Sequence, residues 1–199
     1  NMDMALQAYQ RSISFLTKKN LSSHVDYANA CQGIAAVFLK QEKFDSAFYY
    51  ANHALEIRKK VLGTFHPEYA ASLRSMAMIY FSEDLHKESI KLYLELLGIY
   101  EKIFEPNHKA IAQANNSIAI NYRHLGLYKT AESFARKAKE IYEHNNDLIG
   151  QALMKNNIGY LKMLMGYYDE AEKMIIQAID YQKIHYQNDT TKFYGSIHS

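Results

Sequence analysis

The chain has 199 residues, of which 48% are apolar and 22% charged, so it carries enough apolar surface for one or two domains with a core and is unlike a disordered protein. Lys and Arg number 23 against 21 Asp and Glu, and this net charge of +2 lacks the basic surface of a nucleic-acid-binding protein. No stretch approaches the 18 apolar residues of a membrane span, and a single cysteine, Cys31, excludes an intrachain disulfide and a cysteine-rich zinc site.

Two prolines in the whole chain leave few helix breakers, so we expect long helices. The start of the chain has neither a basic segment nor an apolar signal core, and one thiol suits a reducing compartment. We therefore expect a cytoplasmic protein that contacts neither a membrane nor a nucleic acid.

An internal repeat organises the sequence. A small residue followed three positions later by a larger one recurs at steps of 42, 42 and 40 residues, and we call the small residue the anchor. The four pairs are Ala35 and Phe38, Ala77 and Tyr80, Ala119 and Tyr122, and Gly159 and Lys162. An apolar residue precedes each anchor, and residues of matching type recur nine, twelve and nineteen positions after it. Five positions in register over four copies predict a repeat protein.

In chain order, the pattern predicts a first helix within 3–22 and then four repeats of two helices each, over 24–66, 67–108, 109–147 and 148–187. Subtracting 42 from Asp45 and Ala47 makes Met4 to Lys18 the second helix of a truncated repeat. Gly126 and Gly166 stand at the breaks inside the last two repeats, where a positive φ ends a helix. The segment 188–199 is a tail or the start of a further helix, and we expect the chain to be a piece of a longer array.

These residues resemble the tetratricopeptide repeat, whose pattern of small, aromatic, small and small positions matches Ala119, Tyr122, Ala131 and Ala138. The usual repeat has 34 residues and this one has 42, or about one extra turn on each helix. The long repeat, and the segment 54–67 in particular, is similar to kinesin light chain. The resemblance implies an all-α, right-handed superhelical solenoid whose first helices line a concave groove.

Motifs of catalysis are missing from the sequence: there is no Gly-rich phosphate loop, no His-Glu-x-x-His and no Gly-x-Ser-x-Gly. Nine histidines are spread along the chain, and His66 and His108 lie 42 apart, so they occupy equivalent loops. We interpret these two as loop caps or packing residues rather than metal ligands. The prediction is a protein without catalytic residues, metal or cofactor.

The resemblance also implies which positions face the groove, namely six and three before the anchor and one and four after it. The residues predicted to bind a peptide at these positions are Asn29, Gln32, Arg74, Met78, Phe81, Gln113, Asn116, Ile120, Arg123, Asn156, Tyr160 and Met163. Amide side chains can pair with any peptide backbone, and the two arginines suit a carboxylate. Two alternatives stay open: polar residues on a solvated face need no ligand, and a register shifted by one residue would place Met78 and Phe81 in the core.

Two functions follow from a solenoid with such a groove. The first is a non-catalytic scaffold that holds a protein or peptide segment in the groove. The alternative is a peptide-sensing regulatory domain like those of the Rap group of Gram-positive bacteria, in which a bound peptide reshapes the superhelix. The apolar face of Met4 to Leu16 also predicts self-association through the truncated end of the array.

Overall fold

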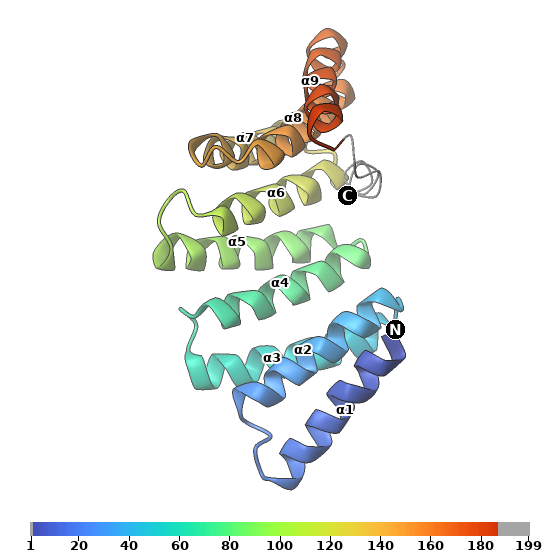
Figure 1. Cartoon of the computed structure of the whole chain (residues 1–199), viewed down its shortest axis with the longest axis vertical. Coiled ribbons are helices and arrows are strands. Elements are labelled where there is room, and N and C mark those ends of the chain that lie inside the picture. The colour runs from blue at the N-terminus through green and yellow to red at the C-terminus, as the bar shows by residue number, and fades with distance from the viewer. Residues whose placement is uncertain (1, 187–199) are drawn as a thin grey trace. The chain divides into compact units, whose positions relative to one another are not determined.

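The computed structural model describes residues 2–186, and within this range the chain forms α-helices joined by turns, with no strand. The predicted tail over 188–199 lies outside the described residues. Residue contacts divide the chain into two compact units, the first ending at Glu105 and the second beginning at Pro106. Each unit is a row of helices, shown in Figure 1 from blue to green for the first and from yellow to red for the second.

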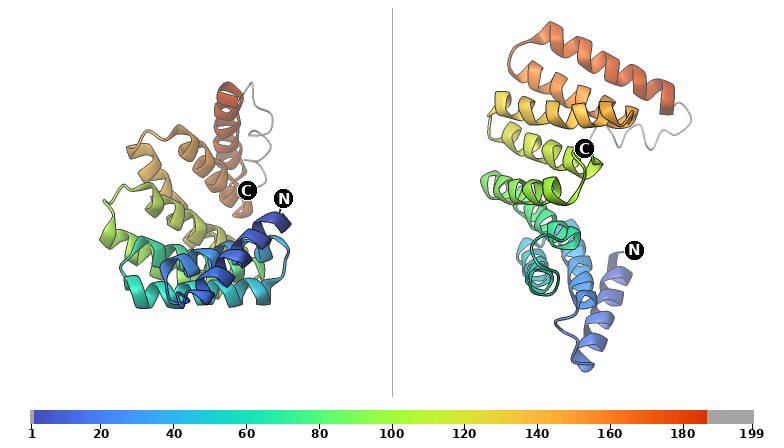
Figure 2. Two further views of the ribbon diagram at one scale, coloured as in Figure 1. Left: turned by 60° about the horizontal axis from the view of Figure 1, so that its bottom comes forward. Right: turned by 90° about the vertical axis from the view of Figure 1, so that its left-hand side faces the viewer.

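In the first unit, consecutive helices lie side by side and run antiparallel (Figures 1 and 2). Its helices are α1 (Met2–Lys18), α2 (Val25–Lys40), α3 (Phe44–Leu62), α4 (Pro67–Ser82) and α5 (His86–Ile103). Besides these neighbours, α2 also contacts α4. The helix predicted from Met4 to Lys18 is confirmed as α1.

The second unit repeats the arrangement with α6 (Lys109–His124), α7 (Tyr128–His144), α8 (Leu148–Leu164) and α9 (Tyr168–Tyr186). Each of these helices packs on the next one along the chain. The helices α2, α4, α6 and α8 carry the four anchors, and we call them the first helices. The exact repeat bounds, 24–66, 67–108, 109–147 and 148–187, stay a prediction.

Small residues at the anchors allow the helices to pack closely. Ala35, Ala77, Ala119 and Gly159 are all buried. A Cβ atom added to Gly159 would lie 2.8 Å from Ile175 Cγ1 and 3.2 Å from the Ala171 carbonyl oxygen, so α8 and α9 approach too closely for a larger residue there. Bulky apolar residues fill the surrounding space, as dense packing requires.

The same type of hydrogen-bonded turn ends each of the first helices. In the turn after α2, the Lys43 N–H donates to the Phe38 carbonyl at 2.9 Å and the Glu42 N–H donates to the Leu39 carbonyl at 3.0 Å. This is the Schellman pattern, which requires a residue with positive φ. That residue is Glu42, Asp84, Gly126 or Gly166 in the four first helices, with φ between 56° and 85°. The prediction that the two glycines end their helices is confirmed.

Histidines cap the N-termini of three of the first helices. The Nδ1 atoms of His24, His66 and His108 each accept a hydrogen bond at 3.2 Å from the backbone N–H two residues later. Each histidine thereby satisfies one of the free N–H groups of a helix N-terminus. The cap role predicted for His66 and His108 is confirmed, and His24 shares it. Asp147 replaces histidine at the start of α8, where its Oδ1 accepts from the Gly150 N–H at 2.9 Å.

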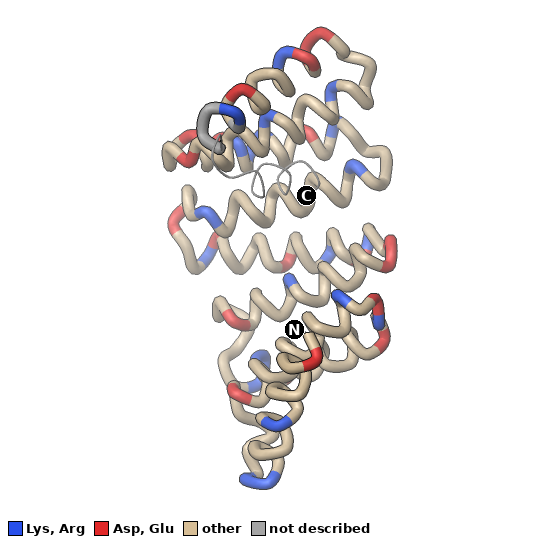
Figure 3. Tube along the Cα trace, turned by 45° about the vertical axis from the view of Figure 1, so that its right-hand side comes forward, with Lys and Arg blue, Asp and Glu red and all other residues tan. Residues whose placement is uncertain are grey.

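Charged residues of both signs are scattered along the helices of each unit (Figure 3), the mixture that a net charge of +2 predicts. Lys162, the residue three positions after the anchor Gly159, is half-buried and pairs with Glu132 at 3.5 Å and Glu170 at 3.1 Å. Among the described residues, no helix is long and apolar enough to cross a membrane.

Candidate functional site

In the first unit, the predicted binding residues come from α2 and α4. Asn29 and Gln32 lie on α2, and Arg74, Met78 and Phe81 lie on α4. Asn29, Arg74 and Met78 are exposed, whereas Gln32 and Phe81 are half-buried. The exposed fraction of Met78 is 46%, so this residue is not in the core. The Phe81 ring packs on the buried His86 ring with 5.2 Å between centroids.

A buried arginine that the sequence pattern did not single out holds part of this surface together. Arg58 lies on α3 and is 5% exposed. Its Nη1 donates to Gln32 Oε1, to Ser72 Oγ at 2.7 Å and to the Glu68 carbonyl at 3.3 Å, and its Nη2 donates to Asn29 Oδ1 at 2.7 Å. The guanidinium therefore links α2 to the first turn of α4.

The charge of Arg58 has one nearby carboxylate. Its Nε lies 3.5 Å from Glu68 Oε2. Burial lowers the pKa of the guanidinium, and the Glu68 carboxylate opposes that effect. An arginine stays protonated in proteins, so the buried charge is offset by the Glu68 carboxylate and by the neutral oxygens that accept from the guanidinium. The cluster thus joins α2, α3 and α4 beneath the surface.

Arg58 also fixes the orientation of the side-chain amides of two predicted residues, Gln32 and Asn29. Gln32 turns its oxygen to Arg58 and donates from Nε2 to Ser75 Oγ at 3.0 Å, so both ends of this amide are occupied within the chain. Asn29 also turns its oxygen to Arg58. Since a guanidinium has donors and no acceptor, the atom of Asn29 that faces it must be the oxygen.

In the second unit, the predicted residues come from α6 and α8. The four on α6 are Gln113, Asn116, Ile120 and Arg123, and the three on α8 are Asn156, Tyr160 and Met163. Gln113, Tyr160 and Met163 are exposed, and the other four are half-buried. The predicted residues of this unit therefore share the surface of two first helices.

Two contacts join α6 to α8 at this surface. The Arg123 guanidinium carbon lies 5.2 Å from the centroid of the Tyr160 ring, within the range of a cation–π interaction. Asn157 Nδ2 donates to Asn116 Oδ1 at 2.9 Å. The sequence reasoning selected Asn156, but the hydrogen bond comes from its neighbour Asn157. The structure thus brings Arg123 and Tyr160 together and places Asn116 in an amide pair.

Burial follows the predicted register in both units. None of the twelve predicted residues is buried. By contrast, the residues that directly precede the anchors, Ile34, Met76, Ile118 and Ile158, are buried. A helix that packs one face against its neighbours and leaves the adjacent face to solvent has this pattern. A register shifted by one residue does not fit it.

Family models decide the identity of the fold. A tetratricopeptide repeat model matches residues 31–102 and 68–144, and a second tetratricopeptide repeat model matches residues 152–185. The chain belongs to the tetratricopeptide repeat (TPR) family. Such repeats form an all-α solenoid that typically serves as a scaffold for contacts between proteins.

Solved structures agree on the fold. The chain matches a putative kinesin light chain of Podospora anserina with nearly identical TPR-like repeats, with a TM-score of 0.81 and 16% identity over 94% of this chain and 89% of that one. It also matches the apo form of RapI, with a TM-score of 0.81 and 18% identity over 97% of this chain and 69% of that one. The predicted similarity to kinesin light chain repeats is therefore confirmed at the level of the fold.

Two curated relatives are much longer than this chain. An RxLR effector protein of Phytophthora infestans is 27% identical over 147 residues, which are 73% of this chain and 43% of the relative. A secreted RxLR effector protein of Plasmopara halstedii is 25% identical over 147 residues, or 73% of this chain and 45% of the relative. The TPR chain spans less than half the length of these two relatives. The cytoplasmic location expected from the sequence stays a prediction.

Proposed function

We propose that this TPR chain is a non-catalytic scaffold that binds an extended or helical peptide segment of a partner protein on the exposed faces of its first helices. The observation that carries the proposal is the contact of Arg123 with the Tyr160 ring, on the same two helices that the Asn116 amide joins. A guanidinium stacked on a ring still has N–H groups for a carboxylate, here besides Nη2, which lies 3.4 Å from His124 Nε2, and an exposed tyrosine offers apolar contact. These groups suit a peptide that carries an acidic side chain or a terminal carboxylate.

The test begins with the full chain as bait for a pool of displayed random peptides. Affinity for a selected peptide is then measured by calorimetry for the wild type, for Arg123→Ala and for the double variant Asn116→Ala with Asn156→Ala. Losing a charge-assisted hydrogen bond costs about 2 kcal/mol, so we expect Arg123→Ala to weaken binding by roughly thirtyfold. The double variant should weaken binding by about tenfold.

The matched control for Arg123→Ala is Arg136→Ala, which removes the same charge from an exposed position on α7. Binding by this control should stay near the wild-type value, and thermal melting of all variants checks that they fold. If Arg123→Ala and the double variant both bind like the wild type, the assignment of peptide binding to the surface formed by α6 and α8 is wrong.

A second candidate is a peptide-sensing regulatory domain. It is supported by the match to RapI and by a match to a Rap protein complexed with competence and sporulation factor, with a TM-score of 0.75 and 20% identity over 97% of this chain and 53% of that one. Small-angle scattering with and without a selected peptide separates the two functions. A change in the radius of gyration favours the sensor, whereas an unchanged radius favours the passive scaffold.

Self-association is a further part of the proposal, because α1 exposes apolar side chains such as Met4 and Phe15. Sedimentation of the wild type and of Met4→Lys tests it. A dimer that dissociates in the variant supports association through α1, and a monomeric wild type contradicts it.

We infer a cytoplasmic location from the sequence alone, because a single cysteine, Cys31, suits a reducing compartment. Imaging of the tagged full-length protein tests the location.

A further inference from the structure

A side-chain hydrogen bond joins the two first helices of each unit at the same place in the repeat. In the first unit, Gln32 Nε2 donates to Ser75 Oγ at 3.0 Å, and in the second unit, Asn157 Nδ2 donates to Asn116 Oδ1 at 2.9 Å. Gln32 and Asn116 stand three residues before their anchors, and Ser75 and Asn157 stand two residues before theirs. We call this hydrogen bond the polar link.

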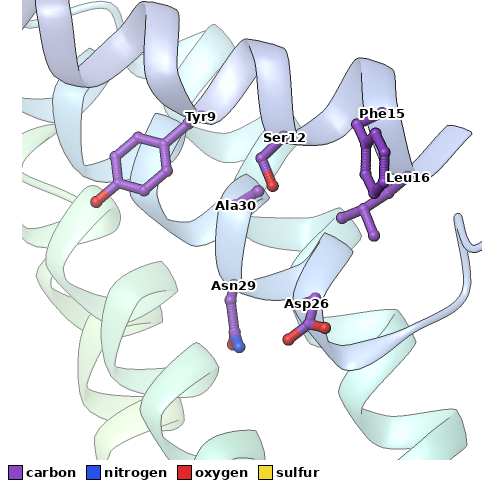
Figure 4. Close-up of a pocket in the computed structure, with 7 residues that line it drawn as sticks. All are labelled: Tyr9, Ser12, Phe15, Leu16, Asp26, Asn29 and Ala30. Carbon is purple, nitrogen blue, oxygen red and sulfur yellow. The ribbon is translucent and has the colours of Figure 1, made fainter.

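In the first unit, the polar link is completed within the chain. The buried Arg58 donates to Gln32 Oε1, so both polar ends of the Gln32 amide are occupied. Arg58 also donates at 2.7 Å to Oδ1 of Asn29, which Figure 4 shows extending from α2 beside Asp26. The amide oxygens on this pair of helices are therefore turned to an internal cation.

In the second unit, the polar link is not completed in this way. Two repeats after Arg58 stands Tyr142, whose ring packs against Gly150. Within the described part of the chain, the side chains of Asn116 and Asn157 hydrogen-bond only to each other. This single bond leaves the Nδ2 group of Asn116 and the oxygen of Asn157 free. Turning both amides over exchanges these roles and again leaves one donor and one acceptor.

Both free groups are accessible. Asn116 and Asn157 are half-buried. Among the described residues, the fully buried side-chain atoms that lack a hydrogen bond belong to Gln41, Arg58, Glu68 and Asn115. The free groups of Asn116 and Asn157 are therefore not enclosed in the core. The surface formed by α6 and α8 thus presents a donor and an acceptor that are held by one amide pair.

A carboxamide matches this combination. The side-chain amide of a glutamine or asparagine carries a donor and an acceptor on one edge, whereas the N–H and C=O of a trans peptide bond point in opposite directions. A carboxylate has no donor and an ammonium group has no acceptor, so each leaves one group of the pair unsatisfied. Covering an unsatisfied polar group costs about 1 to 3 kcal/mol, and this cost is a source of specificity.

The distance to Arg123 limits where this carboxamide lies in a peptide. Asn116 precedes Arg123 by seven residues on α6, and Asn157 precedes Tyr160 by three residues on α8. A helix rises 1.5 Å per residue, so the amide pair lies about 5 to 10 Å from the Arg123–Tyr160 contact along the helices. Two residues of an extended peptide span about 7 Å and place their side chains on the same face. A carboxamide residue two positions from an acidic residue therefore fits both groups.

We propose that Asn116 and Asn157 bind the side-chain carboxamide of a glutamine or asparagine in the partner peptide, two residues from the acidic group at Arg123. Asn157 is then a specificity-determining residue outside the predicted set. The proposal rests on the proposed function for the place of the acidic group. It adds the chemical identity of a second side chain of the partner.

The probes are four peptides of the form acetyl-Ala-X-Ala-Glu-Ala-methylamide, in which X is glutamine, methionine, glutamate or lysine. Methionine has about the length of glutamine and lacks its amide. Binding to the full chain is followed by the NMR signals of the Asn116 and Asn157 side-chain amides. We expect a dissociation constant on the order of 1 mM for the glutamine peptide and about five- to tenfold weaker binding of the methionine peptide. The glutamate and lysine peptides should also bind more weakly than the glutamine peptide.

Asn157→Asp is the decisive variant. Its carboxylate accepts from the Nδ2 group of Asn116, so the polar link is retained, but the surface then presents acceptors only. We expect affinity for the glutamine peptide to fall about tenfold and the lysine peptide to become the tighter ligand of the two. Asn146→Asp is the matched control, because it adds the same charge at an exposed position of the second unit. This control should prefer glutamine over lysine as the wild type does.

Asn157→Ala removes both polar atoms of the side chain and should bind the glutamine and methionine peptides equally. It carries the test if thermal melting shows that Asn157→Asp does not fold. Equal affinity of the wild type for these two peptides overturns the proposal, and so does an Asn157→Asp or Asn157→Ala variant that keeps the wild-type preferences. Failure of the glutamine peptide to bind the wild type at about 10 mM overturns it as well.

Arg123→Ala separates this proposal from the proposed function. The variant should weaken the glutamine and methionine peptides by the same factor, because it removes the partner of the acidic group and leaves the amide pair intact. If it weakens a displayed peptide while the wild type does not prefer glutamine, only the carboxamide assignment is wrong. If glutamine is preferred but Arg123→Ala changes no affinity, the acidic site and the two-residue spacing are wrong and the carboxamide assignment is supported.

Discussion

Gly150 and Gly98 are two helical glycines with opposite surroundings. A Cβ atom at Gly150 would lie 2.3 Å from Cδ1 and 2.4 Å from Cγ of the buried Tyr142, whereas a Cβ at Gly98 meets no atom within 4 Å. Tyr142 is 4% exposed, and the contact reaches the base of its ring, so it has little room to move. The sequence alone does not distinguish these two glycines.

We expect Gly150→Ala to lower the free energy of unfolding by about 1 to 2 kcal/mol, because overpacking against Tyr142 outweighs the helix propensity of alanine. Gly98→Ala is the control and should raise the free energy of unfolding by about 1 kcal/mol. Urea unfolding followed by circular dichroism measures both. A stabilised Gly150→Ala variant would contradict the close approach of Tyr142.

Glu42 and Gly126 occupy equivalent turns with positive φ, 57° and 72°. A side chain in this left-handed conformation costs about 1 kcal/mol, which glycine avoids. We therefore expect Glu42→Gly to stabilise the chain by about that amount and Gly126→Ala to destabilise it by a similar amount. Chemical unfolding of the two variants checks the prediction, and changes of the same sign would contradict it.

At the scale of single elements, the start of α8 depends on an ionised cap. Asp147 accepts from the Gly150 N–H through Oδ1 and from Lys109 Nζ, at 2.7 Å, through Oδ2. The hydrogen bond from Lys109 is the main cause that lowers the pKa of Asp147 below its ordinary value, and the bond from Gly150 adds to it. The folded state therefore favours the ionised carboxylate more than the unfolded state does.

A lowered pKa has a definite consequence for the pH dependence of stability. The contribution of Asp147 is fully present above its pKa in the unfolded chain, about 3.9, and is lost as the pH falls through the lower pKa of the folded state. Asp147→Asn keeps a capping oxygen and removes the charge. We expect this variant to be less stable than the wild type at pH 7, by up to about 1 kcal/mol because Lys109 is exposed.

The difference between wild type and Asp147→Asn should shrink toward acid pH. Urea unfolding at pH 7 and near pH 3 measures it, and Lys139→Gln serves as a control for the loss of an ion pair within a single helix, α7. A difference that grows as the pH falls would mean that the ionised carboxylate does not stabilise the fold.

At the scale of the whole molecule, a repeat protein transmits disturbances only through neighbouring helices. Ile34 in α2 and Ile158 in α8 hold the same register position, and both are fully buried. Ile→Ala at such a site removes about 2 to 5 kcal/mol. We expect Ile158→Ala to speed amide hydrogen exchange in α7, α8 and α9 and to leave α1 and α2 unchanged.

Ile34→Ala is the matched substitution, and it should speed exchange in α1, α2 and α3 while α8 and α9 keep their wild-type rates. Hydrogen-exchange mass spectrometry of the full chain measures both variants. Equal acceleration throughout the chain would show that it unfolds as one cooperative body.

The sequence by itself determined the helices, their breaks and their buried faces. The side of each helix that packs could be predicted from the 42-residue spacing and from the small residues at Ala35, Ala77 and Ala119. This is possible because burial on a helix follows a local period. The positions of the predicted binding residues came instead from the resemblance to the tetratricopeptide repeat. His66 and His108 were recognisable as caps because they recur in equivalent loops.

Only the tertiary structure decided which polar groups meet. Arg58 lies 26 residues from Gln32 and 29 from Asn29 in the sequence. No local period predicts that the guanidinium of this α3 residue lies beneath α2. The same holds for Asn157 beside Asn116 and for the ring of Tyr142 against Gly150. Helix formation depends on neighbours along the chain, whereas the direction of an amide or the space beside a glycine depends on how far apart the packed helices lie.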